Sequence, residues 1–150
     1  MVKSELRPGP ALDIAALFHK HAGKTATACE DAMTYDLSCF KAYDIRGRVP
    51  DALNPDLARA LGRAVADVLG ARSVVLGRDA RLSGPELRDA LAQGLLAAGA
   101  RVTDLGLCGT EEIYYAAANQ PFDAGIMITG SHNPADENGF KLVRAGKEGK

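Results

Sequence analysis

Residues 129–134 read Thr-Gly-Ser-His-Asn-Pro and place a hydroxyl, an imidazole and an amide side by side. They follow the apolar segment 124–128, which is typical of a buried strand. The end of a buried strand holds a reactive group in a fixed position. We expect Gly130 to let a ligand approach the backbone, and Pro134 to stiffen the loop. Ser131 is therefore the first candidate for chemistry.

A serine hydroxyl is a weak nucleophile unless a base or an electropositive pocket activates it. A serine that carries a phosphoryl group needs cations and backbone amides around it. His132 and Lys141 are the candidates for this role, and Asn133 suits the tight backbone of the loop. The alternative is a serine that only caps a turn. The run fits neither the Gly-x-Ser-x-Gly elbow nor a phosphate-binding Walker loop.

Two further polar segments contain arginines close to a glycine. Residues 40–48 read Phe-Lys-Ala-Tyr-Asp-Ile-Arg-Gly-Arg, and guanidinium groups bind phosphate bidentately. An anion site around Arg46 is one interpretation, and a solvated strand end with a local Asp–Arg pair is the other. In residues 77–83, Gly-Arg-Asp-Ala-Arg-Leu-Ser, we expect the arginines to hold the fold or neighbouring loops.

The composition limits the class of protein. The chain has 150 residues, a net charge of −1 and 47% hydrophobic residues, as expected for one globular domain. Neither the charge nor the 5% aromatic content favours nucleic acid or an anionic membrane as a partner. The three cysteines form no CxxC pair, which favours a reducing cytoplasm. No apolar run is long enough to span a bilayer.

Apolar periodicity predicts alternating strands and helices from Phe40 onward. Asn54 is a predicted N-cap, Gly70 a predicted helix end, and Ser83 with Glu86 a predicted capping box. The predicted strands are residues 73–77, 101–106, 124–129 and 140–143, and the predicted helices are 54–69, 83–98 and 111–119.

This pattern predicts an α/β fold, a three-layer α/β/α sandwich with a mixed, mostly parallel sheet. Asn138-Gly139 resembles a hairpin turn, so the last two strands are expected to be antiparallel. The domain is expected to cover residues 39–150. Residues 1–38 show weak periodicity and are predicted to be a loosely ordered extension, with Met33 as an alternative start.

Taken together, these motifs resemble the α-D-phosphohexomutase family. Residues 40–47 are similar to its N-terminal signature, and residues 129–134 with Asn-Gly-Phe-Lys at 138–141 are similar to its phosphoserine loop. Residues 109–114 and 141–144 are similar to the bacterial phosphomannomutase branch, which includes enzymes that accept glucose phosphates. The resemblance covers about residues 39–150.

The resemblance implies a mechanism in which the residue matching Ser131 carries a phosphoryl group. It passes this group to a hexose 1- or 6-phosphate, forming a 1,6-bisphosphate that returns its other phosphate to the serine. The resemblance also implies Mg²⁺ against the phosphoserine and a general acid/base at Lys141. Tyr43, Arg46 and His132 would line the same pocket, with Asn133 contacting the substrate.

The chain departs from the family pattern in extent. The family has four domains, and the Asp-Gly-Asp-x-Asp metal loop of the second is absent here, as are the loops of the third and fourth. We therefore expect the chain to be a piece of a longer protein and to be inactive alone. One alternative is a sugar-phosphate-binding or interaction domain left by gene truncation and without turnover. Another is a family member with an amino-sugar substrate.

Overall fold

The computed structural model of the protein describes residues 35, 37–42 and 44–145. Most of the predicted extension, including Met33, lies outside this range, as does the candidate site residue Tyr43. In chain order the elements are η1 (Leu37–Cys39), β1 (Ile45–Arg48), α2 (Pro55–Leu69), β2 (Ser73–Arg78), α3 (Gly84–Ala97), β3 (Arg101–Leu107), α4 (Thr110–Asn119), β4 (Ala124–Ile128) and β5 (Glu137–Arg144).

One five-stranded sheet organises the domain, with the strand order β1-β5-β4-β2-β3. Strand β4 is central, and β2 pairs in parallel with both β3 and β4. Strand β5 is antiparallel to both of its neighbours, β1 and β4. It therefore runs against the direction that the other strands share, and the predicted mixed, mostly parallel sheet is confirmed.

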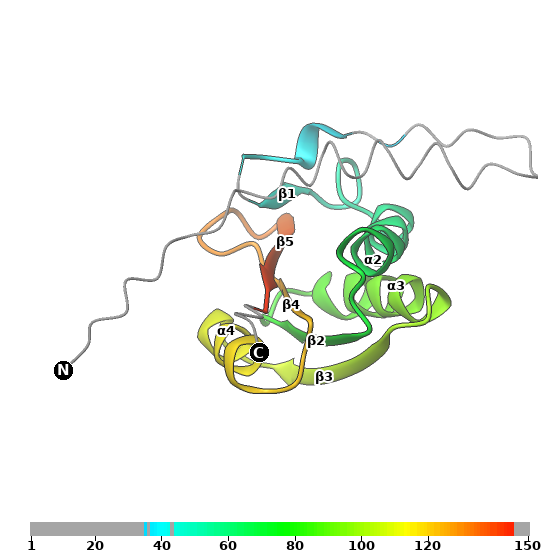
Figure 1. Ribbon diagram of the computed structural model, residues 1–150. Helices are drawn as coiled ribbons and strands as arrows, with labels where there is room; N and C mark the ends of the chain where they lie inside the picture. Colours follow the sequence, from blue (N-terminus) through cyan, green and yellow to red (C-terminus); the bar gives the residue numbers. More distant parts are fainter. Residues whose placement is uncertain (1–34, 36, 43, 146–150) are drawn as a thin grey trace, which may run out of the picture.

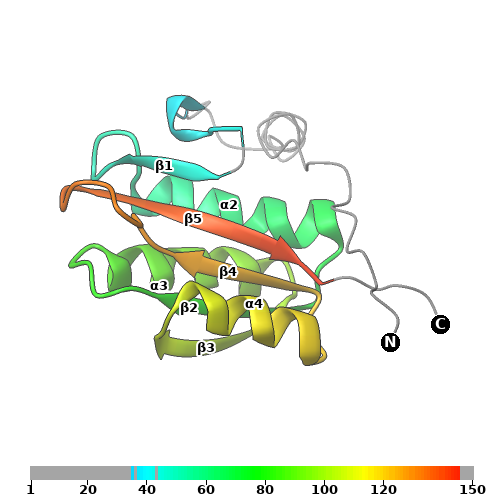
Figure 2. The same ribbon diagram turned by 90° about the vertical axis from the view of Figure 1, so that its left-hand side faces the viewer.

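Helices cover both faces of this sheet. Helices α2 and α3 pack on one face, and α4 lies on the other (Figures 1 and 2). The larger core lies under α2 and α3 and includes Leu61, Leu91 and Phe140. A smaller core under α4 includes Ile113 and Met127. The three-layer α/β/α sandwich is confirmed. None of the described helices has the length and apolar character needed to cross a lipid bilayer.

The ends of α2 follow the local sequence signals. The Asn54 side chain accepts a hydrogen bond from the Leu57 amide at 2.9 Å, and Pro55 occupies the first turn. Gly70 ends the helix in the left-handed region at φ 61°. Both predicted caps of this helix are confirmed.

The predicted capping box at the start of α3 is wrong. Ser83 makes no side-chain cap hydrogen bond. Its hydroxyl instead accepts a hydrogen bond from the Asn138 amide group at 2.8 Å. A buried partner from a distant strand has replaced the local one, because Asn138 is fully buried and needs an acceptor.

The hairpin prediction is right about the pairing and wrong about the turn. Strands β4 and β5 are antiparallel neighbours. However, Asn138 and Gly139 lie inside β5, where they pair with Gly47 and Arg46 of β1. Strand β5 therefore begins three residues earlier than predicted, and the loop that carries Ser131 makes the connection.

Two glycines allow α2 and α3 to pack closely. A Cβ atom added to Gly94 would overlap the carbonyl group of Arg59, and one added to Gly62 would overlap that of Leu91. We expect Gly94→Ala to lower the free energy of unfolding by about 2 kcal/mol, since backbone overlap outweighs the better helix propensity of alanine. Urea unfolding measures this change.

Gly84→Ala is the matched control, because the nearest atom to an added Cβ there is 3.4 Å away. It should leave the unfolding midpoint close to that of the wild type. Equal stability of the two variants would contradict the close packing of α2 on α3.

Candidate active site

Ser131 lies just beyond the end of β4 in an uncommon backbone conformation. The Thr129 amide donates to the Gly139 carbonyl at 2.9 Å, so the ladder with β5 continues one residue past the strand. Ser131 then adopts φ 54°, in the left-handed region. For a residue other than glycine this costs about 1 kcal/mol and persists only where the surroundings impose it.

Thr129 fixes the amide side of Ser131. Its hydroxyl accepts a hydrogen bond from the Ser131 amide at 2.9 Å and donates one to the Asp79 carboxylate at 2.7 Å. Asp79 follows β2 and donates its own amide to the Ile128 carbonyl at 3.0 Å. The ends of two neighbouring parallel strands are thus joined through one buried hydroxyl.

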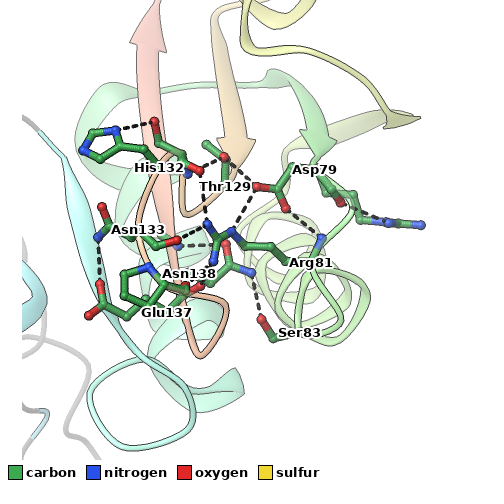
Figure 3. A network of polar contacts seen from close by, with 12 residues as sticks. Asp79, Arg81, Ser83, Thr129, His132, Asn133, Glu137 and Asn138 are labelled. Carbon is green, nitrogen blue, oxygen red and sulfur yellow. Dashed lines mark hydrogen bonds and ion pairs between the residues drawn. The ribbon is translucent and has the colours of Figure 1, made fainter.

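Arg81 fixes the carbonyl side of the same loop. Its guanidinium donates to backbone carbonyls along the loop (Figure 3). The acceptors are Ser131 at 3.1 Å, Asn133 at 2.7 Å, Pro134 at 2.5 Å and Glu137 at 2.7 Å. Asp79 pairs with its Nε at 3.3 Å. The prediction that an arginine of residues 77–83 holds a neighbouring loop is confirmed.

The expected role of Gly130 needs correction. The sequence suggests that this glycine gives a ligand access to the backbone. In the structure the space next to its Cα is filled by Arg81, whose guanidinium carbon would overlap an added Cβ. Glycine is required there because the arginine approaches the backbone closely.

Asn133 links the loop to β1. Its amide oxygen accepts from Arg46 at 3.1 Å, and its amide nitrogen donates to Glu137 at 2.7 Å. Arg46 also pairs with Asp44 at 2.6 Å, so the local Asp–Arg pair weighed from the sequence is present. The structure thus brings Arg46 and Asn133 together.

The reactive groups of the loop lie on its exposed side. Ser131 and His132 are both exposed, and the Ser131 hydroxyl is 3.3 Å from Nδ1 of His132. Lys141 lies on β5 opposite Met127, one pair before the end of β4. Among the described residues, none makes a hydrogen bond or ion pair with the Lys141 ammonium.

Cys108 is a poor rival to Ser131 as a nucleophile. Burial, and then the negative charge of Glu112, raise the pKa of its thiol above the ordinary value. The thiol therefore stays protonated at neutral pH, and only the thiolate is strongly nucleophilic.

Sequence reasoning missed several of the residues that support this site. The candidate Tyr43 lies outside the described residues. Asp79, Thr129 and Asn138 support the loop but were not candidates. No local signal marks Asn138, because its Asn-Gly sequence resembles a turn; its burial in the fold is what shows that its amide needs a partner.

Comparison with known proteins identifies the family. Residues 38–148 match the family model described as phosphoglucomutase/phosphomannomutase, alpha/beta/alpha domain I. The chain belongs to the phosphoglucomutase/phosphomannomutase family. The resemblance drawn from its motifs is therefore confirmed, and the matched region is the domain that in this family is called domain I.

Individual relatives agree with this assignment. The chain is 57% identical over 108 residues to "Phosphohexose mutases" of Xanthomonas campestris pv. campestris (strain B100), covering 72% of this chain and 24% of the relative. It is 54% identical over 110 residues to a phosphomannomutase of Salmonella typhimurium, covering 73% and 24%. The chain thus spans about a quarter of the length of these relatives.

Solved structures of the family share the fold. A phosphoglucomutase/phosphomannomutase family protein from Burkholderia thailandensis superposes with a TM-score of 0.72 at 47% identity, covering 75% of this chain and 27% of that one. A putative phosphomannomutase from Thermus thermophilus superposes with a TM-score of 0.62 at 28% identity, covering 70% and 25%.

The Thr129 hydroxyl gives a direct test of this geometry. We expect Thr129→Val to lower the free energy of unfolding by about 1–3 kcal/mol, because Asp79 and the Ser131 amide each lose a partner. Urea unfolding measures the loss, and amide hydrogen exchange of Ser131 should become faster.

Thr103→Val, at an exposed position on β3, removes the same atom where no described residue makes such a contact. If the free energy of unfolding fell by the same small amount in both variants, the hydrogen bonds of the Thr129 hydroxyl to Asp79 and Ser131 would not hold the loop.

Proposed function

We propose that this chain provides the phosphoserine of a phosphohexomutase. Ser131 would carry a phosphoryl group and pass it to a hexose 1- or 6-phosphate, here mannose or glucose phosphate. The resulting 1,6-bisphosphate would return its other phosphate to the same serine. The observation that carries this proposal is an exposed hydroxyl on a backbone that is held on both sides.

This geometry suits a group that both gives and accepts a phosphoryl group. Positioning and electrostatic stabilisation supply most of the catalysis in phosphoryl transfer. The backbone of Ser131 is held by Thr129 on one side and by Arg81 on the other. Ser131 is exposed, and its hydroxyl lies beside the exposed His132, where a substrate could reach it.

The charges near the loop support distinct roles for the cationic side chains. Asp79 compensates the charge of Arg81, and Asp44 compensates that of Arg46. Lys141, in contrast, pairs with no described residue. We assign it the proton transfer at the sugar hydroxyl, where it would act as general acid and base.

The remaining polar groups would bind the substrate. His132 lies next to the Ser131 hydroxyl and can exchange a hydrogen bond with the phosphate. Arg46 and Asn133, joined to each other, would orient the sugar phosphate. Tyr43 is assigned to the same pocket on the motif alone.

We infer that in the intact protein Mg²⁺ would bind the phosphate on Ser131 and take its other ligands from outside the described residues. Within the described part of the chain, no cluster of three or more His, Cys, Asp or Glu side chains is suited to a metal ion. Asp79 is already used by Thr129 and Arg81. The described residues do not by themselves form a metal site, so the ligands other than the Ser131 phosphate would come from elsewhere in the intact protein.

The first test is whether Ser131 accepts a phosphoryl group. In the intact protein, Ser131→Ala should abolish phosphorylation by a hexose 1,6-bisphosphate and reduce turnover by about 1,000-fold or more, because the carrier atom is gone. Intact mass and a coupled mutase assay measure the two effects.

Ser73→Ala, at the start of β2, is the control and should keep both properties. If Ser131→Ala turned over hexose phosphate at the wild-type rate, the serine would not be the carrier. If the wild type bound hexose phosphate without accepting phosphate or turning it over, the chain would be the binding domain without turnover.

Lys141→Met tests the acid/base assignment. We expect kcat to fall by about 100-fold or more, in the range of general acid–base catalysis, while the melting temperature changes little, because this ammonium has no described partner to lose. Lys41→Met, at an exposed lysine whose ammonium donates to the Ser38 carbonyl, should leave kcat unchanged. A fall in thermal stability without a fall in kcat would make Lys141 structural.

A further inference from the structure

The β2–α3 loop holds the backbone of Ser131 from both sides. Asp79 orients Thr129, which accepts the Ser131 amide, and Arg81 donates to the Ser131 carbonyl. The peptide groups on either side of the Ser131 Cα are therefore fixed by one neighbouring loop. The rotation about Cα–Cβ is the main freedom left to the hydroxyl.

Arg81 is itself held in place. Its side chain is 14% exposed, and its Nε lies 3.3 Å from the Asp79 carboxylate. Its backbone amide donates to the other Asp79 oxygen at 3.0 Å. Gly130 leaves the room that the guanidinium occupies. This side chain is therefore preorganised before any ligand arrives.

The acceptors of Arg81 make the arrangement specific to arginine. They are carbonyl oxygens from both ends of the loop, between Ser131 and Glu137. A planar guanidinium has five N–H donors in a fixed fork, whereas a lysine ammonium is a compact charge with three donors. A lysine would keep the charge but could not bridge both ends of the loop.

We propose that Arg81 is a positioning residue for phosphoryl transfer, because it holds Ser131 in the left-handed conformation that presents its hydroxyl. Its hydrogen bonds reach the backbone carbonyls of the loop and not the Ser131 hydroxyl, so it would act through the loop backbone. This inference rests on the proposed function of Ser131. Without the guanidinium, the loop would relax toward ordinary backbone angles, and the hydroxyl would move away from the substrate.

The experiment compares Arg81→Ala and Arg81→Lys with wild type in the intact protein. We expect kcat to fall by about 100-fold in both, the effect of a shift of roughly 1 Å in a reacting group, with KM changed much less. Guanidinium ion at millimolar concentration should restore part of the rate to Arg81→Ala and none to Arg81→Lys, where the lysine fills the space.

A second readout does not depend on turnover. Hydrogen exchange of the Ser131 amide, measured by NMR on the 150-residue chain, should be faster in both Arg81 variants. Arg88→Ala is the matched control, because Arg88 pairs with Asp89 and Asp104 on α3 and β3. It should keep the wild-type rate and the wild-type exchange.

The outcomes separate this inference from the proposed function. A wild-type protein that never accepts phosphate on Ser131 would refute the proposed function, whatever Arg81 does. Phosphorylation at the wild-type rate in both Arg81 variants would overturn the positioning role alone. A fall in kcat with unchanged hydrogen exchange of the Ser131 amide would also overturn the positioning role. If Arg81→Ala is unfolded, kcat and Ser131 amide exchange measured on Arg81→Lys decide whether Arg81 is a positioning residue.

Discussion

The contact between the Arg81 guanidinium and the carbonyls of the serine loop is the interaction on which the site depends. It joins a loop that follows strand β2 to one that follows its parallel neighbour β4. The carboxyl ends of parallel strands meet at one edge of a sheet, which is where α/β proteins place their ligands. An arginine is suited to this place because one planar group with several N–H donors can bond several carbonyls at once.

Different elements support the serine loop and would contact the ligand. The β2–α3 loop supports the backbone through Asp79 and Arg81 and offers little to a substrate. Strands β1 and β5 instead supply the side chains that we assign to the ligand, Arg46 and Lys141. Strand β5 is antiparallel to β4, so after the serine loop the chain runs back along β4 and carries Lys141 opposite Met127.

Local signals in the sequence predicted the elements well and the supporting contacts poorly. Asn54 caps α2 because its partner is three residues away. Ser83 has an equally good local pattern, yet its hydroxyl bonds Asn138, 55 residues further along the chain. Asn138-Gly139 has the composition of a turn, but burial and pairing with β1 make it part of a strand. Ser131 could be found from its motif, whereas the contacts of Arg81 depend on the sheet order, which spacing alone does not give.

The central claim is that Ser131 carries the phosphoryl group. The most direct measurement is mass spectrometry of the protein purified from its own cells, with the phosphate located by peptide fragmentation. We predict one phosphate, on Ser131, that is replaced by the labelled phosphate when the protein turns over hexose phosphate carrying an isotope-labelled phosphoryl group. An active protein with Ser131 unmodified, and phosphate on another residue or on none, would contradict it.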